Sequence, residues 1–173
     1  VALLVSVDAF TEIYTQLQKD ADQIVSIHTS SLMTGTYENA RQASLHFLGR
    51  CGIQVIDSQA VSFGLGLLVR AAAESAARDA SSDEIVRIVR GMMPRLYTVF
   101  FLDDMAYLER NRLISRSQAV LGNMLGVIPF LTIEDGRIVA MEKVRSRTRA
   151  SEKLLEFVTE FSTVDHMALL HSQ

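Results

Sequence analysis

The chain has 173 residues, of which 49% are hydrophobic and 21% charged, and a formal net charge of −3, which allows one domain or two small lobes around a core. The acidic balance argues against non-specific nucleic-acid binding, and the single cysteine, Cys51, excludes an internal disulfide and a thiolate metal cage. No apolar run is long enough to span a bilayer, so we expect no stable membrane insertion. From the charge and the cysteine count, we also expect no nucleic-acid partner and no metal or other cofactor.

Strand and helix patterns alternate through the first part of the chain. Apolar residues at helical spacing follow Ser6, a potential helix cap, and the segment 81–84 has the pattern of a capping box. The predicted elements are a helix after residue 8, a strand over 23–28, a helix from residue 37, a strand over 53–57, helices over 61–77 and 84–93, and a strand over 97–101. This strand–helix alternation predicts a parallel sheet with helical crossovers.

The second part of the chain has a different pattern, built around a hairpin. Glu134-Asp135-Gly136 is a hairpin turn signal, and Pro129 in the strand before it favours an edge or a bend. The predicted elements are a helix over 105–111, a loop and helix over 112–123, strands over 127–133 and 137–144, a helix over 148–161 with Leu154, Leu155, Val158 and Phe161 inward, and a strand over 167–170. We therefore predict a two-lobed α/β fold with a parallel-sheet first lobe (1–96) and a mixed or antiparallel second lobe (97–173).

Residues 29–36, here called the hydroxyl turn, follow the first predicted strand and lead into a helix. A helix N-terminus has free backbone N–H groups and a positive dipole end, and both favour an anion. The turn contains no Lys or Arg, so a singly charged carboxylate suits it better than a polyphosphate. The alternative is an ordinary Ser/Thr N-cap that binds nothing.

Other chemistry has weaker support in the sequence. Ser31 could act as the nucleophile of an acyl-ester hydrolase or transferase, but its only nearby base is His28, three residues upstream. An interaction module without a ligand is a third interpretation. The basic segment 145–149 is either a solvated connection or a docking surface for an acidic partner.

Several segments occur together in an order typical of one family. They are Ser-Ser-Leu-Met-Thr-Gly-Thr-Tyr at 30–37, Asp-Ser followed by Ser-Phe-Gly-Leu-Gly at 57–66, and shorter matches at 107–115, 121–125, 129, 134–136 and 142–145. In this order the chain resembles the DegV family of bacterial fatty-acid-binding proteins, which includes the FakB subunits of fatty acid kinase. Thr34 replaces a family Ser, Ala2 replaces a family Thr that helps hold the carboxylate, and Arg112 lies one place from the family's arginine.

The resemblance implies a cytoplasmic, non-enzymatic protein that binds a long-chain fatty acid in an apolar tunnel between the lobes. A buried acyl chain contributes about 0.8 kcal/mol per CH₂, and the buried carboxylate needs hydrogen bonds. It also implies that the carboxylate is presented to a separate fatty acid kinase. We expect the chain to lack the first strands and the last helix of such a protein, and to have no catalytic residue. The residues expected to bind the carboxylate are Thr34, Ser31, Gly35, Thr36, Ser30 and Ser6.

Overall fold

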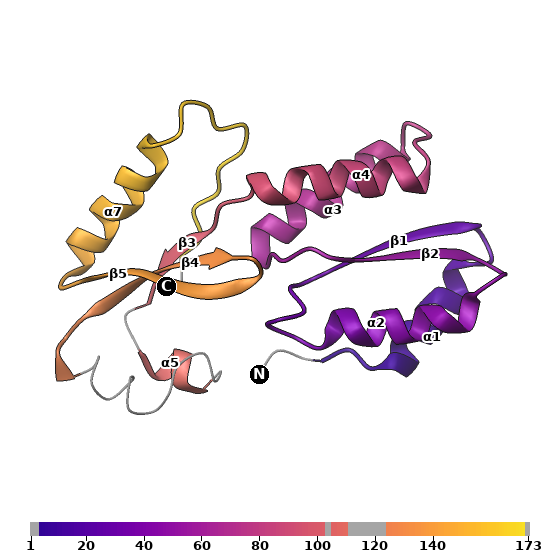
Figure 1. The fold of residues 1–173 in the computed structure, drawn as a ribbon, viewed down its shortest axis with the longest axis horizontal. Helices are drawn as coiled ribbons and strands as arrows, with labels where there is room; N and C mark the ends of the chain where they lie inside the picture. The colour runs from indigo at the N-terminus through magenta and orange to yellow at the C-terminus, as the bar shows by residue number, and fades with distance from the viewer. Residues whose placement is uncertain (1–3, 103–104, 111–123, 172–173) are drawn as a thin grey trace. The chain divides into compact units, whose positions relative to one another are not determined.

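The computed structural model describes residues 4–102, 105–110 and 124–171, and the chain divides into two compact units (Figure 1). The first unit contains Val1–Tyr97 together with Glu134–Arg137, and the second contains Thr98–Ile133 and Ile138–Gln173. The division assigns the tip of a hairpin, Glu134–Arg137, to the first unit although both of its strands belong mainly to the second.

The first unit is a three-layer α/β/α arrangement. Its elements are α1 (Val7–Leu17), β1 (Gln23–His28), α2 (Thr36–Ser44), the 3₁₀ turn η1 (Leu45–Phe47), β2 (Gly52–Asp57), α3 (Ser62–Ala76), α4 (Ser82–Met92) and the 3₁₀ turn η2 (Met93–Arg95). Strands β1 and β2 pair in parallel, in a register that runs from Gln23 opposite Gly52 to His28 opposite Asp57. Helices α1 and α2 cover one face of these strands, and α3 and α4 cover the other (Figure 1). The predicted parallel sheet with helical crossovers is confirmed for this pair.

Alternation along the two strands divides the apolar core into two clusters. Side chains of α1 and α2 pack with Ile24, Ile53 and Val55, whereas side chains of α3 and α4 pack with Val25 and Ile56. Successive residues of a strand point to opposite faces, so one strand can supply both layers. The parallel sheet therefore has apolar cover on both of its faces, as parallel sheets require.

Two of the helix starts that the sequence predicts are confirmed in detail. The Ser6 side chain accepts a hydrogen bond from Ala9 N at 3.2 Å and caps α1. Ser81 and Glu84 form a reciprocal capping box at the start of α4, which satisfies two backbone N–H groups that the helix itself leaves unpaired. Ala40 and Ala43 of α2 and Phe47 of η1 are buried and form one apolar face of this segment.

The second unit is built on an antiparallel sheet with the strand order β3-β4-β5. Its elements are β3 (Val99–Phe101), α5 (Met105–Arg110), β4 (Ile128–Glu134), β5 (Arg137–Val144) and α7 (Arg147–Thr159). The hairpin between β4 and β5 turns at Asp135 and Gly136, whose φ angles of 47° and 77° are both positive. Asp-Gly at this place suits a two-residue turn of this kind, which confirms the prediction.

The structure corrects four expectations for the second part of the chain. The strand predicted over 97–101 is shorter and pairs antiparallel with β4, so it does not extend the parallel sheet. Of the edge or bend expected at Pro129, the edge is wrong, because β4 is the central strand of its sheet. The partner of Phe101 is Phe130, so Pro129 lies beyond the stretch paired with β3, and its missing N–H costs no bond to that strand. Residues 167–170 form no strand, and the Leu155 side chain on α7 is 67% exposed, not inward. The predicted elements over 111–123 lie outside the described residues.

Candidate functional site

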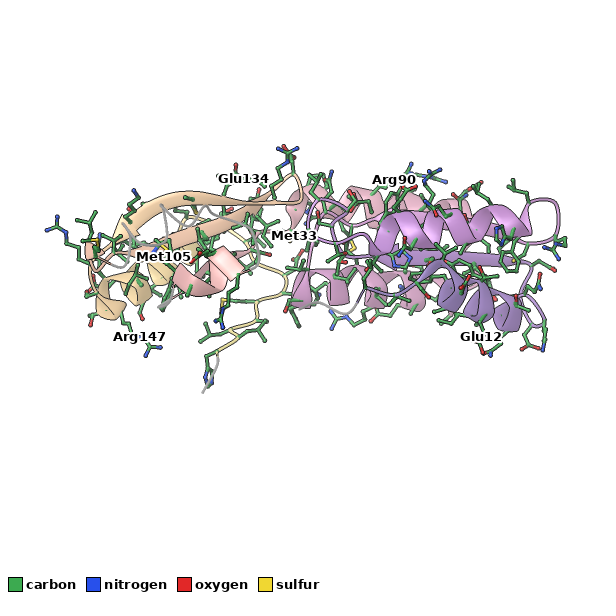
Figure 2. All side chains as sticks on the ribbon, turned by 90° about the horizontal axis from the view of Figure 1, so that it is seen from below. Glu12, Met33, Arg90, Met105, Glu134 and Arg147 are labelled. Carbon is green, nitrogen blue, oxygen red and sulfur yellow. The ribbon has the colours of Figure 1, made fainter. Side chains whose placement is uncertain are left out.

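The hydroxyl turn begins where β1 ends, beside the turn that follows β2. The carboxyl ends of parallel strands lie at the same edge of a sheet, which is where ligands commonly bind in α/β folds. Backbone hydrogen bonds join the two turns, from Ser30 N to Ala60 O at 3.0 Å and from Ser58 N to His28 O at 3.1 Å. Met33, labelled in Figure 2, marks the middle of the hydroxyl turn. The sequence correctly predicts that the two strands end at residues 28 and 57, where the turns begin. No pattern in the sequence indicates that the two turns are bonded to each other.

Ser30 is completely buried and all of its polar groups are hydrogen-bonded. Its hydroxyl donates to Gly136 O at 2.6 Å and accepts from Leu32 N at 3.2 Å. Its carbonyl oxygen accepts from both Met33 N and Thr34 N at 3.1 Å. The Ser30 hydroxyl hydrogen is therefore already used within the protein.

Ser31 is exposed, but its side chain is bonded to an acidic residue of the neighbouring strand. Its hydroxyl and its backbone N both donate to the carboxylate of Asp57, at the end of β2. A second negative group close to Asp57 is disfavoured by like-charge repulsion. The imidazole of His28, the base of the hydrolase alternative, bonds through Nε2 to Ser26.

Thr34 lies in the part of the turn that can still donate a hydrogen bond. Its hydroxyl oxygen is 2.8 Å from that of Thr29 and accepts a long 3.4 Å bond from Thr36 N. When Thr29 is the donor of the pair, the hydroxyl hydrogen of Thr34 is left for another acceptor. Helix α2 begins directly after this pair, and its N-cap residue, Gly35, makes no side-chain capping bond. The N-cap residue of α2 is therefore glycine and not Ser or Thr, and the Thr34 hydroxyl accepts from the first amide of the helix, Thr36 N, only at 3.4 Å.

Ser6 and Gly35 belong to two segments that pack together. The Asn39 side chain donates to Val5 O at 2.8 Å, and a Cβ added at Gly35 would lie 3.3 Å from a methyl of Leu4. The Ser6 hydroxyl is used as the cap of α1, although as an acceptor it keeps its own hydrogen. Glycine at position 35 thus leaves room for the segment that precedes α1.

A buried polar chain that the sequence did not reveal lies beneath the turn. Tyr14 donates to Ser26 at 2.8 Å, and the Ser26 hydroxyl is 2.8 Å from Nε2 of His28. Burial lowers the pKa of His28, and the Asp57 carboxylate partly opposes this change; burial also raises the pKa of Tyr14. The Tyr14 hydroxyl thus bonds to Ser26, and the Ser26 hydroxyl in turn bonds to Nε2 of His28. Residues 26 and 28 lie on the same face of β1, and this alternation is the sequence feature that could have predicted the contact between Ser26 and His28.

A groove of about 520 Å³ lies beside β1 in the first unit, and α3 and α4 supply its other walls. Its lining residues include Val25, Ile27, Ala73 and Ala76, and none comes from β2. Among the described residues, β1 pairs only with β2, so the groove follows the other edge of β1. An acyl chain cannot bond to the backbone groups of a strand edge, whereas another strand can.

Two other features are absent from the described part of the chain. Over residues 4–102, 105–110 and 124–171, no cluster of three or more His, Cys, Asp or Glu side chains could hold a metal ion. Over the same ranges, no helix is both long and apolar enough to cross a membrane.

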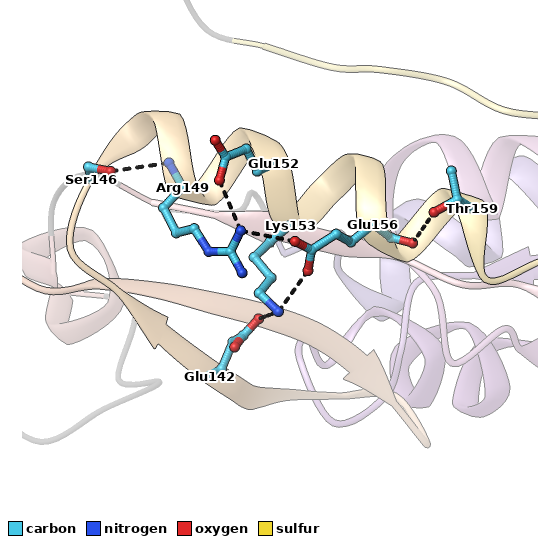
Figure 3. Close-up of polar contacts among 7 residues, drawn as sticks. All are labelled: Glu142, Ser146, Arg149, Glu152, Lys153, Glu156 and Thr159. Carbon is cyan, nitrogen blue, oxygen red and sulfur yellow. Dashed lines mark hydrogen bonds and ion pairs between the residues drawn. The ribbon is translucent and has the colours of Figure 1, made fainter.

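The polar contacts of α7 in the second unit are on its exposed surface (Figure 3). Arg149 pairs with Glu152 and Glu156, each at 2.9 Å, and Lys153 pairs with Glu142 at 3.1 Å and Glu156 at 2.8 Å. Arg149 belongs to the basic segment 145–149, and its charge is already balanced by two carboxylates. This favours the solvated connection over the docking surface at that residue.

The fold and the site define an α/β protein with a hydroxyl-rich turn at the carboxyl ends of parallel strands. Residues 2–171 match the family described as uncharacterised proteins of the DegV family. The chain belongs to the DegV family, as the order of its motifs predicted.

A DegV domain-containing protein of Caldanaerobacter subterraneus is 35% identical over 149 residues, which is 86% of this chain and 53% of the relative. The chain thus spans about half the length of the curated relatives it matches.

Two solved structures with similar folds are of proteins that bind fatty acids. A fatty-acid-binding DegV family protein of Thermus thermophilus superposes with a TM-score of 0.80 at 30% identity, over 91% of this chain and 55% of that one. DegV of Bacillus subtilis, a fatty-acid-binding protein, gives a TM-score of 0.76 at 29% identity, over 89% of this chain and 55% of that one. The predicted family and fold class are therefore confirmed, and structural neighbours of this chain bind fatty acids.

Proposed function

We propose that this chain is part of a protein that binds a long-chain fatty acid, with the carboxylate held at the hydroxyl turn. The observation that carries the proposal is the Thr29–Thr34 hydroxyl pair directly before the start of α2, whose N-cap residue is glycine. One hydroxyl hydrogen of the pair is available, and the helix dipole favours a negative charge at that place. Fatty-acid binding by two similar structures supports the same ligand class.

The predicted binding residues have different parts in this proposal. Thr34 is the main side-chain donor, and Gly35 and Thr36 offer the N-terminal end of α2. Ser6 keeps a hydroxyl hydrogen and is a further possible donor beside α1. Ser30 and Ser31 already donate to Gly136 O and Asp57, so we assign them to the support of the turn.

Substitution of Thr34 by valine tests this assignment. The variant keeps the β-branched shape and removes the hydroxyl, and a hydrogen bond to a charged acceptor is worth about 1.5–3 kcal/mol. We expect palmitate to bind about tenfold or more weakly, as measured by calorimetric titration. Thr15→Val is the matched control, because the exposed Thr15 hydroxyl bonds only to a carbonyl of its own helix. Equal affinity of the Thr34 variant and the control variant would remove Thr34 from the site.

We also propose that the bound carboxylate is presented to a separate fatty acid kinase, as the family resemblance implies. A binding subunit of this kind needs no catalytic base, and within the described residues Ser31 has no imidazole bonded to it. The test adds this chain to a fatty acid kinase with ATP and follows formation of acyl phosphate. Hydrolysis of an acyl ester by this chain alone, lost in Ser31→Ala, would favour the enzyme instead.

A further inference from the structure

The tip of the β4–β5 hairpin contacts the hydroxyl turn through a residue pair that is 106 positions apart in the sequence. The Ser30 hydroxyl donates to Gly136 O at 2.6 Å, and both residues are buried. Glu134, labelled in Figure 2, marks the hairpin beside Gly136 in the sequence. The bond is thus a long-range tie inside the first unit, to which both segments belong.

Position 136 requires glycine for two independent reasons. Its φ of +77° lies in the region that side chains other than glycine rarely adopt. A Cβ added there would also lie 2.5 Å from Ser30 Oγ and 3.4 Å from Gln59 Cα. The φ angle is a property of the hairpin alone. The short Cβ distances show how closely the tip approaches the turns that follow β1 and β2, which contain Ser30 and Gln59.

Ser30 is bonded both to the hairpin tip and to the part of the turn that precedes α2. By donating to Gly136 O, the hydroxyl directs its lone pairs toward Leu32 N, which donates to it at 3.2 Å. The Ser30 carbonyl accepts from Met33 N and Thr34 N. The position of Ser30 therefore fixes three successive amides, the last of which belongs to Thr34.

We propose that Gly136 and Ser30 are positioning residues, through which the hairpin tip holds the hydroxyl turn in the shape that presents Thr34 to a carboxylate. This inference deepens the proposed function and rests on it for the identity of the ligand. Neither residue contacts the ligand in this arrangement. They act by fixing the backbone of residues 32–34, so their loss should loosen the turn before any ligand is added.

Hydrogen–deuterium exchange of the ligand-free 173-residue chain tests the positioning directly. Gly136→Ala and Ser30→Ala should each accelerate exchange at Leu32 by about fivefold or more, as expected for a lost local bond. Gly49→Ala is the matched control: its φ of +76° imposes the same backbone strain, but nothing lies within 4 Å of the added Cβ. Unchanged exchange at residues 32–34 in both test variants would overturn the proposal.

A double variant separates the specific pair from general destabilisation. In Ser30→Ala/Gly136→Ala the hydroxyl oxygen that the added Cβ would meet is gone, so the combined loss of stability should be smaller than the sum of the single losses. Strict additivity in urea unfolding would show that the two residues are not coupled, and would overturn the proposal. The design remains informative if Gly136→Ala is destabilised. The double-mutant cycle compares the stability cost of Gly136→Ala in the chain with Ser30 and in the chain with alanine at position 30.

Palmitate titration of the same variants provides the functional measurement. Ser30→Ala should weaken binding by about fivefold while also accelerating exchange at Leu32 without ligand. Weaker binding with unchanged exchange would mean that Ser30 contacts the ligand directly, and it would overturn the positioning role. If the unsubstituted chain does not bind palmitate, the proposed function fails, whereas the exchange result still decides whether the hairpin tip holds the turn.

Discussion

The turns of the first unit and helix α7 of the second unit differ in where their polar side chains make their contacts. In the first unit, Ser30 and Ser58 are 0% and 2% exposed and bond to backbone groups of the turns and the hairpin tip. In the second unit, Arg149 and Glu152 form an ion pair on α7 with side chains about half exposed, at 47% and 55%. Neutral hydroxyl groups therefore occupy the buried positions, and full charges stay in contact with water.

It follows that a hydrogen bond contributes more to the unfolding free energy where its loss leaves a buried group unpaired. Removing one partner from a buried pair costs the desolvation of the other, whereas an exposed ion pair exchanges its partner for water. Within the described residues, every buried side-chain nitrogen or oxygen has a hydrogen-bond partner. Single substitutions in the turns of the first unit should thus destabilise the protein more than substitutions in the ion pairs of α7.

The largest effect is expected for Ser58→Ala, between the two strand-end turns. The Ser58 hydroxyl accepts from Ala60 N at 3.1 Å and donates to Ala60 O at 3.2 Å, both in buried surroundings. Its loss leaves the amide unpaired and should cost about 1–3 kcal/mol of unfolding free energy in urea. Ser44→Ala is the control, since that hydroxyl bonds at an exposed place to a carbonyl of its own helix. Equal effects at the two serines would contradict the comparison.

A smaller loss is expected for Tyr14→Phe, which removes one hydroxyl from the buried polar chain. Tyr14 is 1% exposed and donates to Ser26. The ring and its edge contact with Phe47 remain, so the change should cost about 1 kcal/mol in thermal or urea unfolding. Tyr97→Phe, at a tyrosine that is 63% exposed, serves as the comparison and should change stability less.

The same buried chain predicts a pH dependence through His28. Burial lowers the pKa of His28 from its ordinary value of 6.5, so the folded state favours the neutral ring and the unfolded state binds the proton more readily. This contribution to stability is fully present above about pH 6.5 and is lost as the pH falls toward the lower folded pKa. Unfolding free energies between pH 7.5 and 5.5 should therefore fall less in His28→Gln than in the unsubstituted chain.

The smallest effect is expected for Arg149→Gln, in the ion pairs of α7. The side chain is exposed, and its two glutamate partners are solvated as well. We expect no measurable change in the midpoint of urea unfolding at physiological salt, because exposed ion pairs are screened. A loss as large as that of Ser58→Ala would show that α7 depends on its surface charges, contrary to the difference between α7 and the turns of the first unit.

Much of the fold could be predicted because local patterns determine it. The cap at Ser6, the capping box at Ser81 and the Asp135–Gly136 turn all depend on residues a few positions apart, as do the positions of strands β1 and β2 in the sequence. Predictions for the second part of the chain were less accurate where burial depends on distant partners. Leu155 has helical spacing with its apolar neighbours, yet its side chain points to solvent. Periodicity identifies an apolar face but not how far a neighbouring element covers it.

The sequence by itself determined the hydroxyl turn, its place between a strand and a helix, and the family to which the chain belongs. Only the tertiary structure decided how the hydroxyl groups are used: Ser30 bonds to Gly136, Ser31 bonds to Asp57, and Thr34 shares its bond with Thr29. The physical reason is that a hydroxyl bonds to whichever partner folding places within about 3 Å. Two of those partners lie 26 and 106 residues away, beyond the reach of any local pattern.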